Sequence, residues 1–150
     1  MDQIDRNLLA ALTRDAGQSY AQLGDIVGLS APAVHDRVKK LRKAGVIRGI
    51  EARIDAASVG KPLLAFVHID TTGWGKSPGL MALADFPEVE EIHSVTGDTC
   101  MLLKVRVRDS QALEGLLARI YALDDVRSTR SYVALSTYLE RGPQAGISDA

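Results

Sequence analysis

The first fifty residues place their apolar side chains at helical spacing in three successive segments. The first stripe ends before Gly17 and consists of Ile4, Leu8, Leu9 and Leu12. Asp2 stands before it at the position of an N-cap. Because polar residues fill the other positions, each segment is predicted to be an amphipathic helix that buries one side.

The second and third segments are predicted to be short helices joined by a tight turn at Gly28. Ser19 and Gln22 have the spacing of a capping box, in which each side chain satisfies a free backbone donor of the first turn. Ser30 is expected to cap the next helix, which stops at Gly45. Its apolar stripe consists of Val34, Val38 and Leu41. Two helices joined in this way form a helix-turn-helix.

Residues 46–54 alternate apolar and polar side chains, which predicts a half-buried strand that acts as a wing. Gly60-Lys61-Pro62 interrupts this pattern. We therefore expect a winged helix-turn-helix domain over residues 1–54 and a hinge over residues 55–62.

The second half of the chain alternates strands with helices. Strands are expected at residues 63–70, 89–96, 100–107 and 126–138, and helices at 78–86 and, with Ser110 as N-cap, at 110–122. This order predicts an α+β chain whose residues 63–140 form a ferredoxin-like βαββαβ domain. Two helices would cover one face of its antiparallel sheet and leave an open, aliphatic face. Residues 141–150 have no periodicity and are expected to form a frayed tail.

Charge distinguishes the first half of the chain from the second. The whole chain has a formal net charge of −1, whereas residues 30–53 hold seven basic and two acidic residues, a local net of +5. Such a patch fits a module that meets phosphates. A charge run alone more often coats a solvated helix, but together with the turn, the caps and the strand it favours DNA binding.

The face of the third helix opposite its apolar stripe supplies candidates for DNA contact. Residues near its start are expected to reach base edges and the later cations to contact phosphates. The base-edge candidates are Pro32, His35, Asp36 and Lys39, the phosphate candidates are Lys40, Arg42, Lys43 and Arg48, and Ser30 and the flanking Arg37 complete the set. For His35, a solvated surface role is the alternative.

Composition and motif spacing argue against several other classes of protein, among them disulfide-rich, metal-binding and membrane proteins. The single cysteine, Cys100, rules out a disulfide framework and fits a reducing compartment. The three histidines are scattered, so no metal site, cofactor or Cys/His catalytic set is expected. Asp70 stands where a phosphate-binding loop over residues 72–78 would need glycine; Trp74 in that loop is expected to be an exposed subunit anchor. No apolar run is long enough to span a membrane, so the cytoplasm is expected.

Segments along nearly the whole chain, to about Leu139, resemble the Lrp/AsnC family of leucine-responsive or feast/famine regulators. The matching segments are IDRNLLAALTRD, LGDIVGLSAPAVHDRVKKLRKAGVIRGI, IDAASVG, VEEIHSVTGDTCMLLKV and TRSYVAL. The resemblance implies a transcriptional regulator that binds double-stranded DNA. It also implies that the C-terminal, ACT-like (RAM) domain pairs through its sheet into homodimers, assembles further, and binds a small effector, commonly an amino acid.

The resemblance also indicates effector-binding residues. These are Val95, Thr96, Gly97, Asp98, Thr99 and Cys100 in one turn, and Tyr132 and Val133 on the last strand. Backbone N–H groups around a glycine turn can hold a carboxylate. Many relatives carry an aspartate where this chain has Cys100, and a neutral thiol cannot make a charge-assisted bond to an ammonium group. Either Asp98 or another chain supplies the charge, or the effector differs, or no amino acid binds.

Two rival functions remain open from the sequence. Ferredoxin-like domains host many enzymes, although residues 61–140 show no constellation of acid, base or nucleophile. Alternatively, the basic unit could dock a protein instead of DNA.

Overall fold

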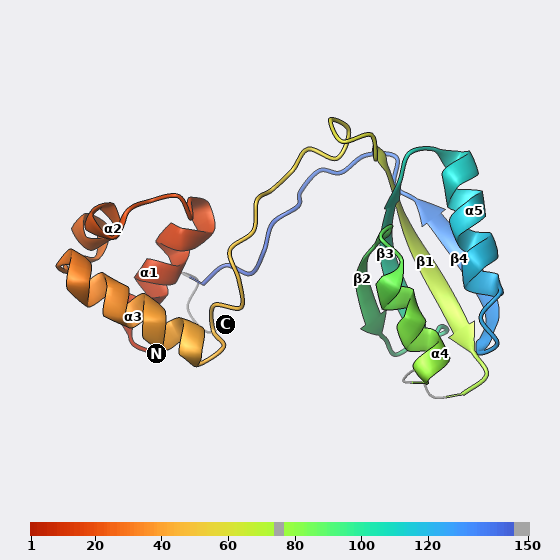
Figure 1. The fold of residues 1–150 in the computed structure, drawn as a ribbon, viewed down its shortest axis with the longest axis horizontal. Coiled ribbons are helices and arrows are strands. Elements are labelled where there is room, and N and C mark those ends of the chain that lie inside the picture. Colours follow the sequence, from red (N-terminus) through yellow and green to blue (C-terminus); the bar gives the residue numbers. More distant parts are fainter. Residues whose placement is uncertain (74–76, 146–150) are drawn as a thin grey trace. The chain divides into compact units, whose positions relative to one another are not determined.

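The computed structural model describes residues 1–73 and 77–145, and the chain divides into two compact units. The first unit is Met1–Ala52 together with the segment that starts at Leu139, and the second is Arg53–Tyr138. Figure 1 shows helices in the first unit and the sheet with its helices in the second. Each unit has its own hydrophobic core. Trp74, the expected subunit anchor, and the last five residues of the expected tail lie outside the described residues. Among the described residues, no helix is long and apolar enough to cross a membrane.

Three helices form the first unit: α1 (Gln3–Arg14), α2 (Tyr20–Val27) and α3 (Ala31–Lys43). The sequence predictions for all three helices are confirmed, and the capping boxes at Asp2 and Ser19 are both present. Ser30 occupies the N-cap position of α3, but its side chain makes no capping hydrogen bond, so that part of the prediction is wrong. The apolar stripes meet in a core that consists of Leu8, Ala11, Leu23, Val34, Val38 and Leu41.

Two glycines allow the tight turn between α2 and α3. Gly28 ends α2 with a φ of +70°, in the left-handed region that glycine adopts most readily. Gly24 lies inside α2, and its carbonyl accepts a hydrogen bond from the N–H of Leu29 at 2.9 Å. A Cβ atom at position 24 would lie 2.3 Å from the carbonyl oxygen of Leu29. The close approach of α2 to the turn therefore requires glycine at this position.

Residues 46–54 form no strand, so the predicted wing strand is wrong. The side chains of Ile50, Ala52 and Ile54, which the alternation predicted to be half-buried, are exposed. A strand needs a neighbouring strand to pair with its backbone groups, and no described residue of the first unit belongs to one. The alternating pattern therefore lies on irregular chain that leaves α3 after Gly45.

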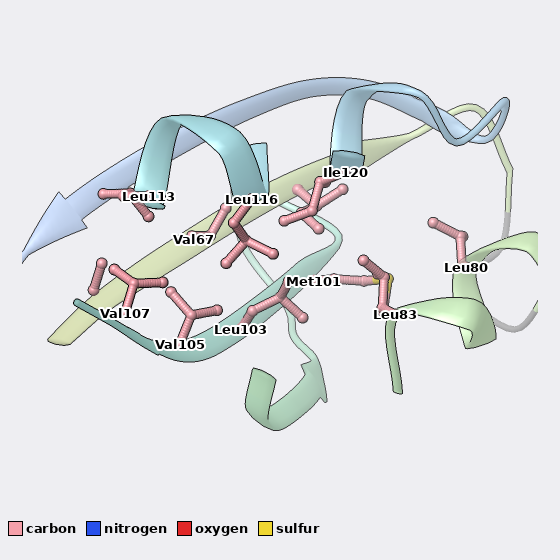
Figure 2. Packing of buried hydrophobic residues seen from close by; sticks show 12 residues of the cluster. Val67, Leu80, Leu83, Met101, Leu103, Val105, Val107, Leu113, Leu116 and Ile120 are labelled. Atoms are coloured by element: carbon pink, nitrogen blue, oxygen red, sulfur yellow. The ribbon is translucent and has the colours of Figure 1, made fainter. Parts of the chain in front are cut away.

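An antiparallel sheet of four strands forms the second unit, in the order β2-β3-β1-β4. The strands are β1 (Leu63–Thr71), β2 (Val89–Ser94), β3 (Met101–Val107) and β4 (Val126–Val133). The helices are α4 (Pro78–Met81), which continues as the 3-10 turn η1 (Ala82–Asp85), and α5 (Ser110–Tyr121). Alternate residues of β1 and β3 pack beneath these helices (Figure 2). The predicted βαββαβ order and the α+β fold class are confirmed.

Several elements of this unit differ from the prediction at their ends, and β2, for example, ends at Ser94 instead of Thr96. Two of the differences have a clear physical reason. The N-cap of α5 is Asp109, not Ser110, because the Asp109 carboxylate accepts a hydrogen bond from the N–H of Ala112 at 2.8 Å. The last strand ends at Val133 instead of Tyr138. Its partner β1 begins at Leu63, so the chain beyond Ala134 has no neighbouring strand with which to pair. The Tyr138 side chain is consequently 97% exposed.

The uncovered face of the sheet is not aliphatic, contrary to the prediction. A register shift between Val89 and Glu91 brings two consecutive carboxylates to Lys104, with Nζ–O distances of 3.4 Å to Glu90 and 3.5 Å to Glu91. Glu90 also accepts from Arg106 Nε at 2.7 Å. Toward β1 and β4 the same face carries aromatic groups, which include Phe66, His68 and Tyr132. The face therefore combines ion pairs on β2 and β3 with aromatic groups on β1 and β4, beside the aliphatic Leu64 and Leu102.

Alanine substitution at two helical glycines is expected to have opposite effects on stability. Gly24→Ala should lower the free energy of unfolding by about 1–3 kcal/mol, because its methyl group overlaps a backbone carbonyl. Gly115→Ala on α5 should raise it by about 0.5–1 kcal/mol, since a Cβ there meets nothing within 4 Å. Urea denaturation followed by circular dichroism measures both changes. A neutral effect of Gly24→Ala would contradict the close approach at the turn.

Candidate functional site

Helix α3 turns one side toward the core and the other toward solvent. Its apolar stripe of Val34, Val38 and Leu41 is buried. Nine of the ten predicted DNA-contact residues are exposed, namely Ser30, Pro32, His35, Asp36, Lys39, Lys40, Arg42, Lys43 and Arg48. Arg37 is the half-buried exception. Eight of the exposed residues lie on α3 or at its cap, and Arg48 lies on the irregular chain that follows.

The exposed side of α3 is cationic and electrostatically unsatisfied. Within the described part of the chain, no carboxylate lies within ion-pair distance of the five exposed cations, which are Lys39, Lys40, Arg42, Lys43 and Arg48. Three of these cations stand in the last turn of α3, where the negative end of the helix dipole favours positive charge. Cations without an internal partner on one exposed face can neutralise the phosphates of a DNA backbone.

Near the start of the same face, His35 is oriented by its neighbours. Its ring lies edge-on to the ring of Tyr20, with a centroid distance of 5.4 Å. Its Nδ1 lies 3.5 Å from the Asp36 carboxylate, and both side chains are more than half exposed. Tyr20, at the start of α2, was not singled out from the sequence because it lies 15 residues before His35. The three side chains together offer donors and acceptors to a base edge.

Arg37 points to α1 instead of solvent. Its Nη1 donates to Asp2 Oδ2 and to Asp5 Oδ1, at 2.7 Å in both cases. This contact joins the middle of α3 to the first turn of α1.

The predicted effector turn connects β2 to β3 and is attached to the end of β1. The Thr99 side chain is buried, and its hydroxyl donates to the carbonyl of Ile69 at 3.1 Å. The N–H of Cys100 donates to the same carbonyl at 3.2 Å. Gly97 has a φ of +127°, which explains why glycine stands there. The other members of the turn are accessible, since Val95 is half-buried and Thr96, Asp98 and Cys100 are exposed.

Arg130 of β4 holds the tip of this turn. Its Nη1 donates to Asp98 Oδ2 at 3.1 Å, and its Nη2 donates to the backbone carbonyl of Asp98 at 3.0 Å. The hydrogen bond from Arg130 holds the pKa of the Asp98 carboxyl below its ordinary value. The carboxylate considered from the sequence as a partner for an effector's ammonium group is thus already paired. No sequence signal links Arg130 to a residue 32 positions earlier.

The two predicted effector residues on β4 lie on opposite faces of the sheet. Tyr132 is opposite Phe66 and Val133 is opposite Ala65, and adjacent strand residues point to opposite sides. The Tyr132 ring lies 5.0 Å from the His68 ring, on the face that also carries Arg130. One protomer therefore does not direct both side chains to one ligand. Among the described residues, no group of three His, Cys, Asp or Glu side chains could hold a metal ion.

Comparisons with known proteins match both units. A family model for a winged helix-turn-helix DNA-binding domain matches residues 1–48, and one for the Lrp/AsnC ligand binding domain matches residues 64–144. The chain is 40% identical over 139 residues to the HTH-type transcriptional regulator LrpA of Mycobacterium tuberculosis, covering 92% of each chain. It is 31% identical over 140 residues to the regulator FL11 of Pyrococcus horikoshii, covering 93% of each.

Solved structures give the same result. AsnC of E. coli superposes with a TM-score of 0.87 at 29% identity, over 96% of this chain and 98% of that one. A feast or famine regulatory protein from M. tuberculosis, complexed with L-methionine, superposes with a TM-score of 0.86 at 38% identity. That match covers 93% of this chain and 95% of the other.

Lys43 tests the phosphate-contact assignment. Lys43→Ala should weaken binding to all DNA sequences alike and lower the magnitude of the salt slope by about 0.9, the value for one phosphate contact. The matched control is Arg108→Ala, which removes one charge from an exposed residue of the second unit. Fluorescence anisotropy over a salt series measures both slopes. Equal slopes for Lys43→Ala and the wild type would remove Lys43 from the interface.

Proposed function

Because this chain belongs to the Lrp/AsnC family of transcriptional regulators, we propose that it regulates transcription by presenting the exposed face of α3 to a specific DNA sequence. The observation that carries this proposal is the cationic, unpaired side of α3 opposite its buried stripe. Its second unit is a ligand-binding domain of the same family, which we propose senses a small molecule.

We assign two roles along α3. Side chains near its start, which are Pro32, His35, Asp36 and Lys39, read base edges in the major groove. Those near its end, Lys40, Arg42, Lys43, and Arg48 beyond it, contact phosphates and so position the helix without reading sequence. All eight side chains are exposed, and the cations among them form no ion pair within the described residues, which supports contact with DNA. The division between the two roles rests on position along the chain, since the start of a recognition helix contacts base edges.

We infer that the working form is a homodimer that assembles into larger oligomers. Two copies of α3 would then read a roughly palindromic site in successive major grooves. The uncovered sheet face supports pairing between second units, because Phe66 and Tyr132 remain exposed there. As a DNA-binding regulator, the chain would act in the cytoplasm and have no catalytic role.

An amino acid is the effector class that we propose, bound at the turn of residues 95–100. Support comes from a relative 38% identical to this chain that was solved with L-methionine. Beside Gly97, the Asp98–Arg130 pair supplies one negative and one positive group. Both side chains are accessible, so an amino acid that replaced their mutual contact would place its ammonium group by Asp98 and its carboxylate by Arg130, although position 100 is a cysteine. Binding would favour one oligomeric arrangement and so change the affinity for DNA.

The direct test of the function uses the purified full-length chain and the DNA upstream of its own gene. Anisotropy over a salt series should show steep salt dependence and tighter binding than to a random duplex of the same length. Adding amino acids singly should identify one that shifts the affinity. Equal binding to both duplexes would exclude that promoter as a target. Failure on both at low salt would favour the protein-docking function.

Arg130 tests the effector assignment separately. Arg130→Met should abolish the shift that the amino acid causes, while the salt slope of DNA binding without the amino acid stays that of the wild type, because Arg130 lies outside the DNA-binding unit and contacts no phosphate. Arg127→Met on the same strand is the matched control, since Arg127 is also exposed but does not bind Asp98. Equal responses of the two variants would contradict a role for the Asp98–Arg130 pair.

A further inference from the structure

One cation of α3, Arg37, forms ion pairs with carboxylates at the start of α1. Arg37 is 30% exposed in its side chain, and its two ion-pair partners lie 35 and 32 residues earlier in the chain, at the start of α1. Asp5 is the less accessible partner, with 15% side-chain exposure, and Asp2 is 54% exposed. The contact is therefore partly shielded from solvent, which lowers the screening of its charges.

All four oxygens of the two carboxylates take part in one closed network. Asp2 Oδ1 accepts from the N–H of Asp5 at 2.8 Å, and Asp5 Oδ2 accepts from the N–H of Asp2 at 3.0 Å. The remaining oxygens, Asp2 Oδ2 and Asp5 Oδ1, accept from Arg37 Nη1. The capping box of α1 thus orients both carboxylates independently of Arg37. Because both carboxylates are held in place, the charge-assisted hydrogen bonds from Arg37 have a fixed direction.

We propose that Arg37 is a positioning residue that sets the rotation of α3 against α1 and does not contact a phosphate. The core contacts of α3 are all aliphatic, and apolar contacts have no preferred direction. The hydrogen bonds from Arg37 fix the rotation of α3 about its own axis, because they tie the flank of α3 to the first turn of α1. Its neighbours on the helix, His35 and Asp36, are base-edge candidates. A small rotation of α3 would displace them from the bases.

The network stays intact at neutral pH. The hydrogen bond from the backbone of Asp5, followed by that from Arg37, lowers the pKa of Asp2 below its ordinary value. A carboxyl whose pKa is lowered on folding stabilises the native state above its unfolded pKa, and loses this effect only as pH falls through the lowered value. The Asp2 part of the network is therefore present throughout the neutral range and is lost only in acid.

The inference rests on the proposed DNA binding, so the experiment starts from the duplex that the wild-type protein selects from a random-sequence pool. Arg37→Met and Asp5→Asn are then compared on this duplex and on a random duplex. Arg37→Met should lower the ratio of the two affinities by about tenfold, the effect of roughly one mismatched base pair. Asp5→Asn should lower the ratio by a smaller factor, because the bond from Arg37 to Asp2 remains. The salt slope should remain that of the wild type. The double variant should lose no more than Arg37→Met alone, because Asp5 acts on α3 through Arg37.

Arg42→Met is the matched control. It should lower the salt slope by about 0.9 and weaken binding to both duplexes alike, as expected of a phosphate contact. Partial unfolding of a variant also weakens both affinities together, so it leaves their ratio unchanged. The proposal is overturned if Arg37→Met lowers the slope as Arg42→Met does, or if Asp5→Asn leaves the ratio at the wild-type value. Failure of the wild type to select any duplex would instead reject the proposed function.

Discussion

Helix α3 buries three aliphatic side chains, Val34, Val38 and Leu41, against the other helices of the first unit. A helix of this length can hide only one stripe, so the burial of these residues forces the cations between them into solvent. The tight turn at Gly24 and Gly28 keeps the stripe in place, because it sets how closely α3 follows α2. The polar surface that can meet DNA is thus a consequence of the packing beneath it.

Two arginines perform similar structural tasks in the two units. Arg37 ties α3 to the capping box of α1, and Arg130 ties β4 to the turn between β2 and β3. Each bonds to an aspartate that lies more than 30 residues away in sequence and next to a proposed binding surface. Because a guanidinium presents several donors in a fixed plane, it can orient a partner as well as attract it. Both proposed surfaces therefore depend on a polar contact that lies beside them.

The sequence predicted the features that depend on neighbouring residues. Capping boxes and apolar stripes act over three or four positions, so α1, α2 and α3 were correctly predicted, as were the order of strands and helices and the family. The wing strand was wrongly predicted, because the alternation of apolar and polar residues over 46–54 does not show whether a partner strand exists. The ion pairs on the open sheet face depend on a register shift beside Glu91, which appears only once β2 is paired with β3.

In the candidate sites too, features set by neighbouring residues could be predicted from the sequence, and features set by distant segments could not. Exposure of the candidates within α3 other than Arg37 follows from the helical period, whereas Ser30 and Arg48 lie outside the helix. The partners of Arg37 and Asp98 could not be predicted, since they come from distant segments that only the tertiary fold brings together. Tyr20 was missed for the same reason, as it meets His35 across the turn between α2 and α3.

Selection of binding sites from a random DNA pool, followed by sequencing, tests most directly whether the exposed start of α3 reads sequence. The wild-type chain should enrich a roughly palindromic site with half-sites about one helical turn apart, and a His35→Ala/Lys39→Ala variant should enrich a relaxed or different site while still binding DNA at low salt. Enrichment of no sequence by the wild type, or of an identical site by the variant, would contradict the account.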